Sequence, residues 1–289
     1  MKNFPRFRYL KPYNAPQKCL FVFLLLFCFL PVLTGQSEPD TIISQFVEKV
    51  QKIEPREKAW PYFSNEYDVS EDRNFFIPRP DRYNVRKRIP VSNLPKAINV
   101  VEQAPGGKFF VAYEQTEVGA DTFYILSDRG VTINRITFGV YPRIRFSANG
   151  KYATISNNFG PEFLIVDSAG LVIYRCQDYK SLGIPKTEPL IHVDVFPNGE
   201  AFLVSSSGLR CFSIRDRKLL WVYDKTIEES AVFPGNKPVL VQRSGGLYFL
   251  NKTTGKEIEA ITGGCRGQLW AGGRIEMQCD HGVYEVRVK

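Results

Sequence analysis

Two hairpin patterns follow one another in the middle of the chain: Ile144-Arg-Phe-Ser-Ala-Asn-Gly-Lys-Tyr-Ala-Thr-Ile155 and Phe163-Leu-Ile-Val-Asp-Ser-Ala-Gly-Leu-Val-Ile-Tyr-Arg175. Each pattern consists of two short runs rich in β-branched and aromatic residues, joined by a turn that contains glycine. Such runs are typical of β-strands, and the glycine supplies the positive φ that a tight hairpin needs. Residues 144–175 are therefore predicted to form four antiparallel strands.

The same two hairpins recur along the chain. The turn glycines of the first hairpin are spaced by 43, 49, 36 and 38 residues, at Gly107, Gly150, Gly199, Gly235 and Gly273. The second hairpin follows the first four copies, at residues 123–136, 163–175, 210–223 and 247–260. One small sheet cannot bury both of its faces alone, so the copies are expected to stack side by side.

Two of the turns resemble those of known repeat proteins. Phe146-Ser-Ala-Asn-Gly-Lys-Tyr152 and Leu250-Asn-Lys-Thr-Thr-Gly-Lys-Glu257 resemble the blade turns of WD40-like and quinoprotein-like β-propellers. The Trp-Asp dipeptide of WD40 blades and the Ser-x-Asp-x-Gly box of sialidases are absent. For residues 96–289 the resemblance implies the fold of a β-propeller, and the five copies of the repeat predict that this all-β domain has about five four-stranded blades. It implies no activity.

The fifth copy has only three strands, the last of them at residues 283–288. A closed ring needs a fourth strand from elsewhere, because an unpaired edge tends to pair with other chains. We expect residues 85–91, just ahead of the first blade, to supply it in a monomer. An open array of blades, or a larger ring formed by dimerisation, is the alternative.

Residues 1–35 have the features of an export signal. An apolar run at residues 19–33 follows five basic residues and precedes the small residues Thr34 and Gly35, as in a secretory signal peptide. A membrane-spanning helix needs about 20 apolar residues, so this run is short for one. The alternative is an uncleaved N-terminal membrane anchor. In both cases we expect residues 36–289 outside the cytoplasm: periplasmic, secreted or anchored there.

The net charge of +8 belongs mostly to this leader. The chain has 38 Lys and Arg against 30 Asp and Glu, and five of the cations lie in residues 1–35, which contain no acid. The remaining chain therefore keeps only +3. Proteins that neutralise many phosphates carry their basic excess in the folded domain. We therefore expect no nucleic-acid partner.

Residues 36–95 are predicted to form a helix and a linker. Apolar residues at helical spacing in residues 40–54 predict an amphipathic helix that ends at Pro55. Six prolines and seven aromatic residues in residues 55–95 predict an extended linker that lies on a surface. Within it, Arg86, Lys87 and Arg88 either are solvated or contact an acidic partner or an anionic membrane.

Export would place four cysteines in an oxidising compartment, where up to two disulfides can form. If residues 271–273 form a three-residue turn, Cys265 faces Cys279 within disulfide reach, and we predict that bond. Cys176 and Cys211 either pair or remain buried thiols, and we favour buried thiols. The cysteine spacing does not fit a zinc site, and we expect no metal and no cofactor.

Candidate site residues lie in the second and third copies of the repeat. Tyr141, Arg143 and Arg145 come at the start of one copy, and His192 and Asp194 share one strand face in the next. A histidine beside a carboxylate can perform acid–base chemistry, although such a pair more often only forms a hydrogen bond in a core.

Two functions follow from these features. The first is an exported, non-catalytic propeller that binds or scaffolds another protein, using the loops at one end. The alternative is a hydrolase or lyase with its site in a central channel. Convergence of the carboxylates and His192 in the folded chain would favour the enzyme, whereas a plugged channel would favour binding.

We predict that the mature protein begins near Gln36, because Leu33 and Gly35 then occupy the −3 and −1 positions of the cleavage site. Mass spectrometry of the N-terminal peptide of the protein recovered from its producing cell measures this directly. An intact Met1 on the exported protein would contradict cleavage and favour the anchor.

Overall fold

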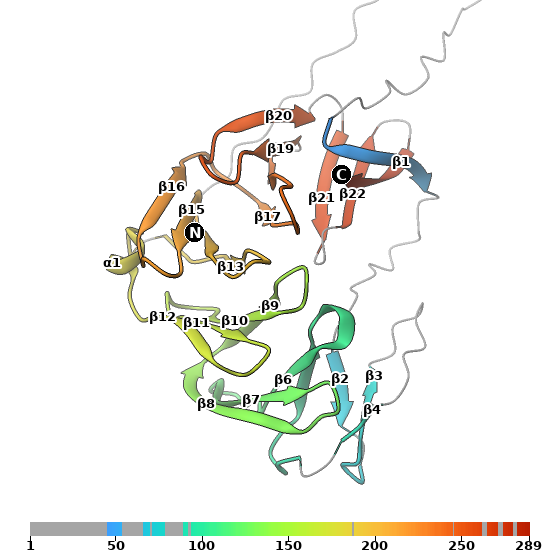
Figure 1. The fold of residues 1–289 in the computed structure, drawn as a ribbon, viewed down its shortest axis with the longest axis vertical. Helices are drawn as coiled ribbons and strands as arrows, with labels where there is room; N and C mark the ends of the chain where they lie inside the picture. Colours follow the sequence, from blue (N-terminus) through green and yellow to red (C-terminus); the bar gives the residue numbers. More distant parts are fainter. Residues whose placement is uncertain are drawn as a thin grey trace, which may run out of the picture. The chain divides into compact units, whose positions relative to one another are not determined.

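Figure 1 shows the computed structural model of the chain. It describes residues 45–53, 66–69, 71–78, 89–91, 94–186, 188–244, 246–261, 265–270, 274–279 and 282–289. Residues Ile42–Lys289 form one compact unit. The predicted leader and Arg86, Lys87 and Arg88 lie outside the described residues, so the inferences about them stay predictions.

The described part of the chain is all-β apart from one short α-helix, α1 (Tyr179–Leu182), and one 3₁₀ turn, η1 (Pro105–Gly107). The Asp178 side chain caps α1 by accepting a hydrogen bond from the Ser181 N–H. No helix within the described ranges has the length and apolar character needed to cross a membrane.

Four antiparallel sheets of four strands follow the predicted repeat. The second sheet is β9 (Pro142–Phe146), β10 (Tyr152–Asn157), β11 (Phe163–Asp167) and β12 (Val172–Cys176). The third is β13 (His192–Val195), β14 (Ala201–Ser205), β15 (Leu209–Ser213) and β16 (Leu219–Tyr223). The fourth is β17 (Glu229–Ala231), β18 (Val239–Arg243), β19 (Gly246–Leu250) and β20 (Glu257–Ile261). The fifth is β1 (Val47–Ile53), β23 (Gly282–Val288), β22 (Arg274–Cys279) and β21 (Cys265–Trp270).

The first sheet is larger than the repeat predicts, with seven strands in the order β4-β3-β2-β5-β6-β7-β8. Its repeat strands are β5 (Val100–Gln103), β6 (Phe109–Tyr113), β7 (Ala120–Ser127) and β8 (Thr132–Val140). Three more strands extend it: β2 (Glu66–Val69), β3 (Phe75–Pro78) and β4 (Ile89–Pro90). The predicted hairpins of all five copies therefore correspond to observed strands.

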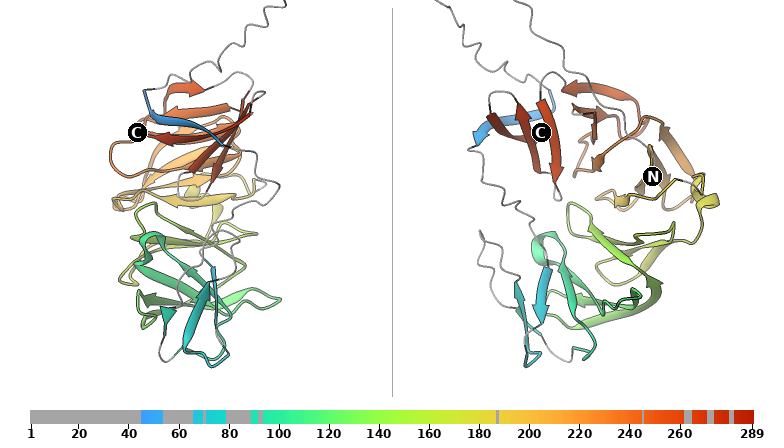
Figure 2. Two further views of the ribbon diagram at one scale, coloured as in Figure 1. Left: turned by 90° about the vertical axis from the view of Figure 1, so that its right-hand side faces the viewer. Right: turned by 180° about the vertical axis from the view of Figure 1, so that it is seen from behind.

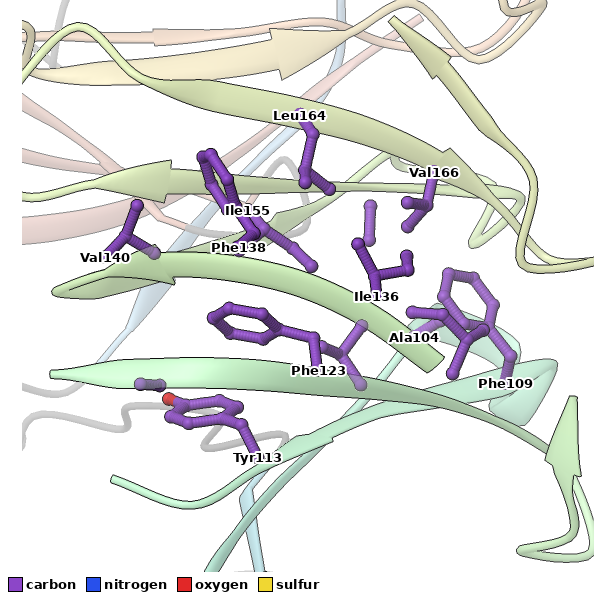
Figure 3. Packing of buried hydrophobic residues seen from close by; sticks show 14 residues of the cluster. Ala104, Phe109, Tyr113, Phe123, Ile136, Phe138, Val140, Ile155, Leu164 and Val166 are labelled. Atoms are coloured by element: carbon purple, nitrogen blue, oxygen red, sulfur yellow. The ribbon is translucent and has the colours of Figure 1, made fainter. Parts of the chain in front are cut away.

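Successive sheets pack on one another through apolar clusters. Alternate residues of β11 divide between the two neighbours: Leu164 and Val166 pack toward the first sheet, and Phe163 and Ile165 toward the third. Figure 3 shows the first of these clusters, in which Phe123 and Ile136 lie opposite Ile155 and Leu164. Similar clusters join the third sheet to the fourth and the fourth to the fifth. The core is therefore a series of inter-sheet layers.

The turn glycines hold neighbouring sheets close together as well as forming the hairpins. Gly150 has a φ of 64°, which is the left-handed region that other residues adopt with strain. A Cβ added there would collide with the carbonyl oxygen of Pro105 in η1, the turn between β5 and β6 of the first sheet. Glycine at this position is therefore required by both the turn and the sheet contact.

The helix expected over residues 40–54 is wrong where the chain is described. Val47–Ile53 forms strand β1, which pairs antiparallel with β23 and completes the fifth sheet (Figures 1 and 2). Phe46 stacks on Phe249 at a ring-centroid distance of 5.3 Å, and its carbonyl accepts a 2.7 Å hydrogen bond from the Lys289 N–H. Pairing with β1 satisfies the hydrogen-bonding groups of the β23 backbone. This stabilisation outweighs the helix preference that the spacing of the apolar residues indicates.

The fourth strand of the last sheet therefore comes from the N-terminal side of the repeats, as expected, but from a different segment. Residues 85–91 do not supply it in their described part: Ile89 and Pro90 form β4, which pairs with β3. The expected linker is likewise wrong where described, since β2, β3 and β4 add to the first sheet. Arg73 fixes this segment by donating hydrogen bonds to the carbonyls of Pro95 and Ile98.

The register of the last hairpin agrees with the sequence analysis. Cys265 is the strand partner of Cys279, and Trp270 is the partner of Arg274. The side chains of the two cysteines lie outside the described residues, so the disulfide stays a prediction. Cys176 and Cys211 are buried free thiols, as we favoured. Burial raises the pKa of both, that of Cys211 to about 12, which keeps them protonated.

We predict that strand β1 stabilises the fold and protects the edge of β23. Phe46→Ala should lower the free energy of unfolding by about 1–2 kcal/mol, because it removes a half-buried stacked ring. Deletion of residues 45–53 should lower the unfolding temperature further and cause self-association, because β23 becomes an open edge. Thermal unfolding and size-exclusion chromatography measure both effects.

Val118→Ala is the control for these variants, because its side chain is 81% exposed in a loop. An unchanged unfolding temperature and elution volume after the deletion would contradict the role assigned to β1.

Candidate functional site

The first strands of the second, third and fourth sheets bring a set of polar side chains together. Arg145 lies on β9, His192 and Asp194 lie on β13, and Glu229 and Ser230 lie on β17. Ser205 joins them from β14, where it is the strand partner of His192. We call these six residues the inner polar cluster. Of the residues proposed from sequence, Arg145, His192 and Asp194 are thus brought together.

Arg145 links the three sheets electrostatically. Its Nε lies 2.7 Å from Asp194 Oδ1, and its Nη1 lies 3.1 Å from Glu229 Oε1. Its Nη2 also approaches the Ser230 carbonyl oxygen at 3.4 Å. One guanidinium from the second sheet therefore holds a carboxylate on the third sheet and one on the fourth. Such a charged group is stable away from water only because it is paired.

His192 is 1% exposed and sits among oxygens. Its Nε2 lies 2.9 Å from Ser205 Oγ and 3.0 Å from Ser230 Oγ. The same nitrogen lies 3.3 Å from Asp194 Oδ2 and 3.2 Å from Glu229 Oε1. Ionised carboxylates only accept hydrogen bonds, so this geometry places a hydrogen on Nε2.

The charges within the inner polar cluster shift the pKa values of its own members. Burial on its own would raise the pKa of Asp194, but the Arg145 guanidinium and His192 lower it to about 2. Burial on its own would lower the pKa of Arg145, but Asp194 and Glu229 raise it. Both groups therefore stay charged at neutral pH, and each stabilises the other's charged form.

The cluster lacks the geometry of a Ser-His-Asp triad. In a triad, one histidine nitrogen faces the serine and the other faces the carboxylate. Here Ser205, Ser230 and Asp194 all face the same nitrogen, and both serines are 0% exposed. Among the residues the structure describes, no group of His, Cys, Asp and Glu side chains could hold a metal ion. The arrangement instead fits an electrostatic link between sheets.

Tyr141 and Arg143, which were also proposed from sequence, make contacts outside the inner polar cluster. The Tyr141 hydroxyl donates to the Glu117 carbonyl at 2.9 Å, and the Tyr141 ring contacts Phe159 edge-on at 5.1 Å. Arg143 donates to Asn158 Oδ1 at 2.5 Å and to the Ile191 carbonyl. Burial is the main cause that lowers the pKa of Arg143, with the charge of Arg145 adding to it.

These contacts join three loops into one exposed surface. The loops between β6 and β7, β8 and β9, and β10 and β11 contribute Val118, Tyr141 and Phe159, which are 81%, 39% and 74% exposed. We call these three residues the loop patch. Large apolar side chains that gather on loops at this exposure are typical of binding surfaces.

Sequence reasoning missed part of both sites. Glu229 and Ser230 start a strand in the fourth repeat just as His192 does in the third, so aligning the first strands of the copies could have found them. Phe159 lies in Asn157-Asn-Phe-Gly-Pro161, a turn sequence with an apolar residue at its tip. No comparable signal marks Ser205, which is 0% exposed and whose Oγ lies 3.2 Å from Ser230 Oγ of the fourth sheet.

Comparison with known proteins does not place the chain in a family. No protein-family model matches the chain, and no curated protein matches it. One similar solved structure is described as the crystal structure of the eukaryotic initiation factor. It is 11% identical with a TM-score of 0.46, over 76% of this chain. The chain spans 58% of the length of that structure. This likeness fits a loosely similar β-rich fold and carries no argument about function.

We predict that Asp194→Asn lowers the free energy of unfolding at pH 7 by about 2 kcal/mol, since a pKa lowered from 3.8 to about 2 corresponds to that energy. A lowered pKa in the folded state stabilises the protein above the pKa of the unfolded state. That stabilisation is lost as the pH falls from about 4 to about 2. The difference between wild type and variant should therefore shrink in this window, measured by denaturant unfolding at each pH.

Asp128→Asn, an exposed carboxylate in the turn between β7 and β8, is the matched control and should change little. A difference for Asp194→Asn that stays constant from pH 7 to pH 2 would show that its charge does not stabilise the fold.

Proposed function

We propose that this chain is a non-catalytic protein-binding module of the cell envelope or the extracellular space, which uses the loop patch to hold its partner. The observation that carries the proposal is the contrast between the two candidate sites. In the inner polar cluster the charged groups already pair with one another, whereas most of the surface of Val118 and Phe159 in the loop patch is exposed. Aromatic side chains commonly supply much of the energy of protein interfaces.

The loops of the patch hold one another in place, and Arg143 on β9 ties them to the second sheet. Tyr141 is fixed by its hydrogen bond to Glu117 and by its contact with Phe159. Asn158, next to Phe159, is held by Arg143 and donates its N–H to the Tyr141 carbonyl at 2.8 Å. Little conformational freedom is then lost when a partner binds, and preorganisation of this kind raises affinity.

The architecture that we propose is a propeller-like array of five blades. The packing of each sheet on the next supports it, as does the completion of the last sheet by β1. The face of the first sheet that the last blade would cover in a closed ring is instead covered by its own strands. Tyr67, Phe76 and Val91 pack there on Phe110 and Leu126. This favours the open array over the closed ring.

A photo-crosslinking amino acid placed at residue 159 in the producing cell tests the proposal. We expect a discrete adduct with one partner, reduced when Tyr141→Ala is added, because the substitution removes the ring and the hydroxyl that position the loop. Residue 169 is the matched control site, since Ala169 is exposed in the turn at the opposite end of β11. Adducts that are the same at both positions, or absent at residue 159, would contradict the proposal.

The convergence of Arg145, His192, Asp194 and Glu229 is the observation that favours the second candidate, a hydrolase or lyase. Arg145 and Glu229 keep 26% and 30% of their side chains exposed, so a small substrate could reach them. Turnover in a substrate screen that Asp194→Asn abolishes, with the fold retained by circular dichroism, would support the enzyme over the binding module.

A further inference from the structure

Strand β16 offers a second surface, distinct from the loop patch. It lies at the end of the order β13-β14-β15-β16, and in the described part of the chain no strand pairs with its outer side. Trp221 and Tyr223 on this strand are buried in the cluster that joins the third and fourth sheets. The backbone of β16 is therefore held in an extended conformation while one row of its hydrogen-bonding groups faces outward.

The other three residues of β16 are apolar and exposed. Leu219, Leu220 and Val222 are 48%, 53% and 47% exposed. The strand thus presents a free edge and an uncovered apolar face at the same place. Extended peptides bind to such edges by strand addition, in which main-chain hydrogen bonds supply affinity and alternate side chains supply specificity.

The sequence of β16 differs from that of every other edge strand in the described sheets. Edge strands usually carry charges or proline, which discourage pairing with other chains. Nine of the ten edge strands follow this rule, for example Arg135 on β8, Arg175 on β12, Glu259 on β20 and Pro90 on β4. Strand β16 reads Leu-Leu-Trp-Val-Tyr and contains neither.

Basic side chains surround this edge. Arg215, Arg217 and Lys218 are exposed just before β16, and Lys225 follows it. Two carboxylates offset them in part. The Asp216 carboxylate accepts a hydrogen bond from the Ser213 hydroxyl, which in turn accepts one from the Asp216 N–H, and Asp224 lies at the other end of the strand. Lys225 pairs with Glu257 at 2.8 Å. The unbalanced positive charge therefore lies at the start of the strand.

We propose that β16 binds an extended, acidic segment of a partner protein by strand addition. Such a segment has apolar residues at alternate positions, which cover Leu220 and Val222, and Asp or Glu residues that reach Arg215 and Lys218. This surface and the loop patch lie on different elements, so the two proposals can fail separately.

Peptide binding to the purified protein tests the inference. The probe is a blocked, fluorescently labelled peptide of alternating valine and threonine with two glutamates at each end. The matched peptide carries lysines in place of the glutamates. By fluorescence anisotropy at low salt, we expect the acidic peptide to bind at least tenfold more tightly than the basic one. Its binding should weaken as salt rises, and it should slow hydrogen exchange of the β16 amides.

Val222→Lys and Leu220→Lys should each weaken binding of the acidic peptide at least tenfold, since they place a charge on the apolar face of the edge. Both side chains are exposed, so the fold should tolerate the changes, which thermal unfolding verifies. Ile258→Lys on β20 is the matched control, because Ile258 is 47% exposed, as Val222 is. It should leave binding unchanged.

Three results would overturn the inference. The first is no binding of the acidic peptide, or equal binding of the acidic and basic peptides. The second is binding that neither Val222→Lys nor Leu220→Lys weakens. The third is dimerisation of the wild-type protein that Val222→Lys abolishes, which would identify a second copy of the chain as the occupant of the edge.

Discussion

The structure depends on the need to cover both faces of each small sheet. Side chains alternate between the two faces of a strand, so β11 directs Leu164 and Val166 toward one neighbouring sheet and Phe163 and Ile165 toward the other. A sheet that is apolar on both faces is stable only with a neighbour on each side. The first sheet has no preceding repeat, and strands β2, β3 and β4 cover its remaining face. The last sheet has only three strands of its own, and β1 completes it.

The same stacking of sheets places charged side chains in a partly buried position. Strands β9, β13 and β17 each begin a sheet, and together they bring Arg145, Asp194 and Glu229 into contact. Partly buried charges of this kind are stable only when they are paired, because their loss of hydration must be offset. The arrangement accounts for the low pKa of Asp194 and leaves His192 enclosed by hydroxyl and carboxylate oxygens. The two binding surfaces that we propose, the loop patch and β16, therefore lie apart from these paired charges.

The errors of the sequence analysis are confined to the segment before the repeats. The apolar residues of residues 40–54 fit a helical period, yet Val47–Ile53 is a strand because β23 offers an open edge more than 220 residues away. The prolines and aromatic residues of residues 55–95 indicated a linker, yet Tyr67 and Phe76 are buried against Phe110. Local patterns fail at such positions because the partner that determines the conformation is distant in the chain. Within the repeats, partners are adjacent in sequence, and the hairpins were predicted correctly.

The amino-acid sequence by itself determined the number of repeats, the two hairpins in each of the first four, their turn glycines and the strand register that places Cys265 opposite Cys279. All of these follow from local periodicity and turn chemistry, which act over a few residues. Only the tertiary structure decided which segment completes the last sheet, what covers the first one, and which polar side chains meet. It also showed that β16 is an exposed edge and that Phe159 adjoins Tyr141. Such features depend on contacts between residues far apart in the chain, and no local pattern encodes those contacts.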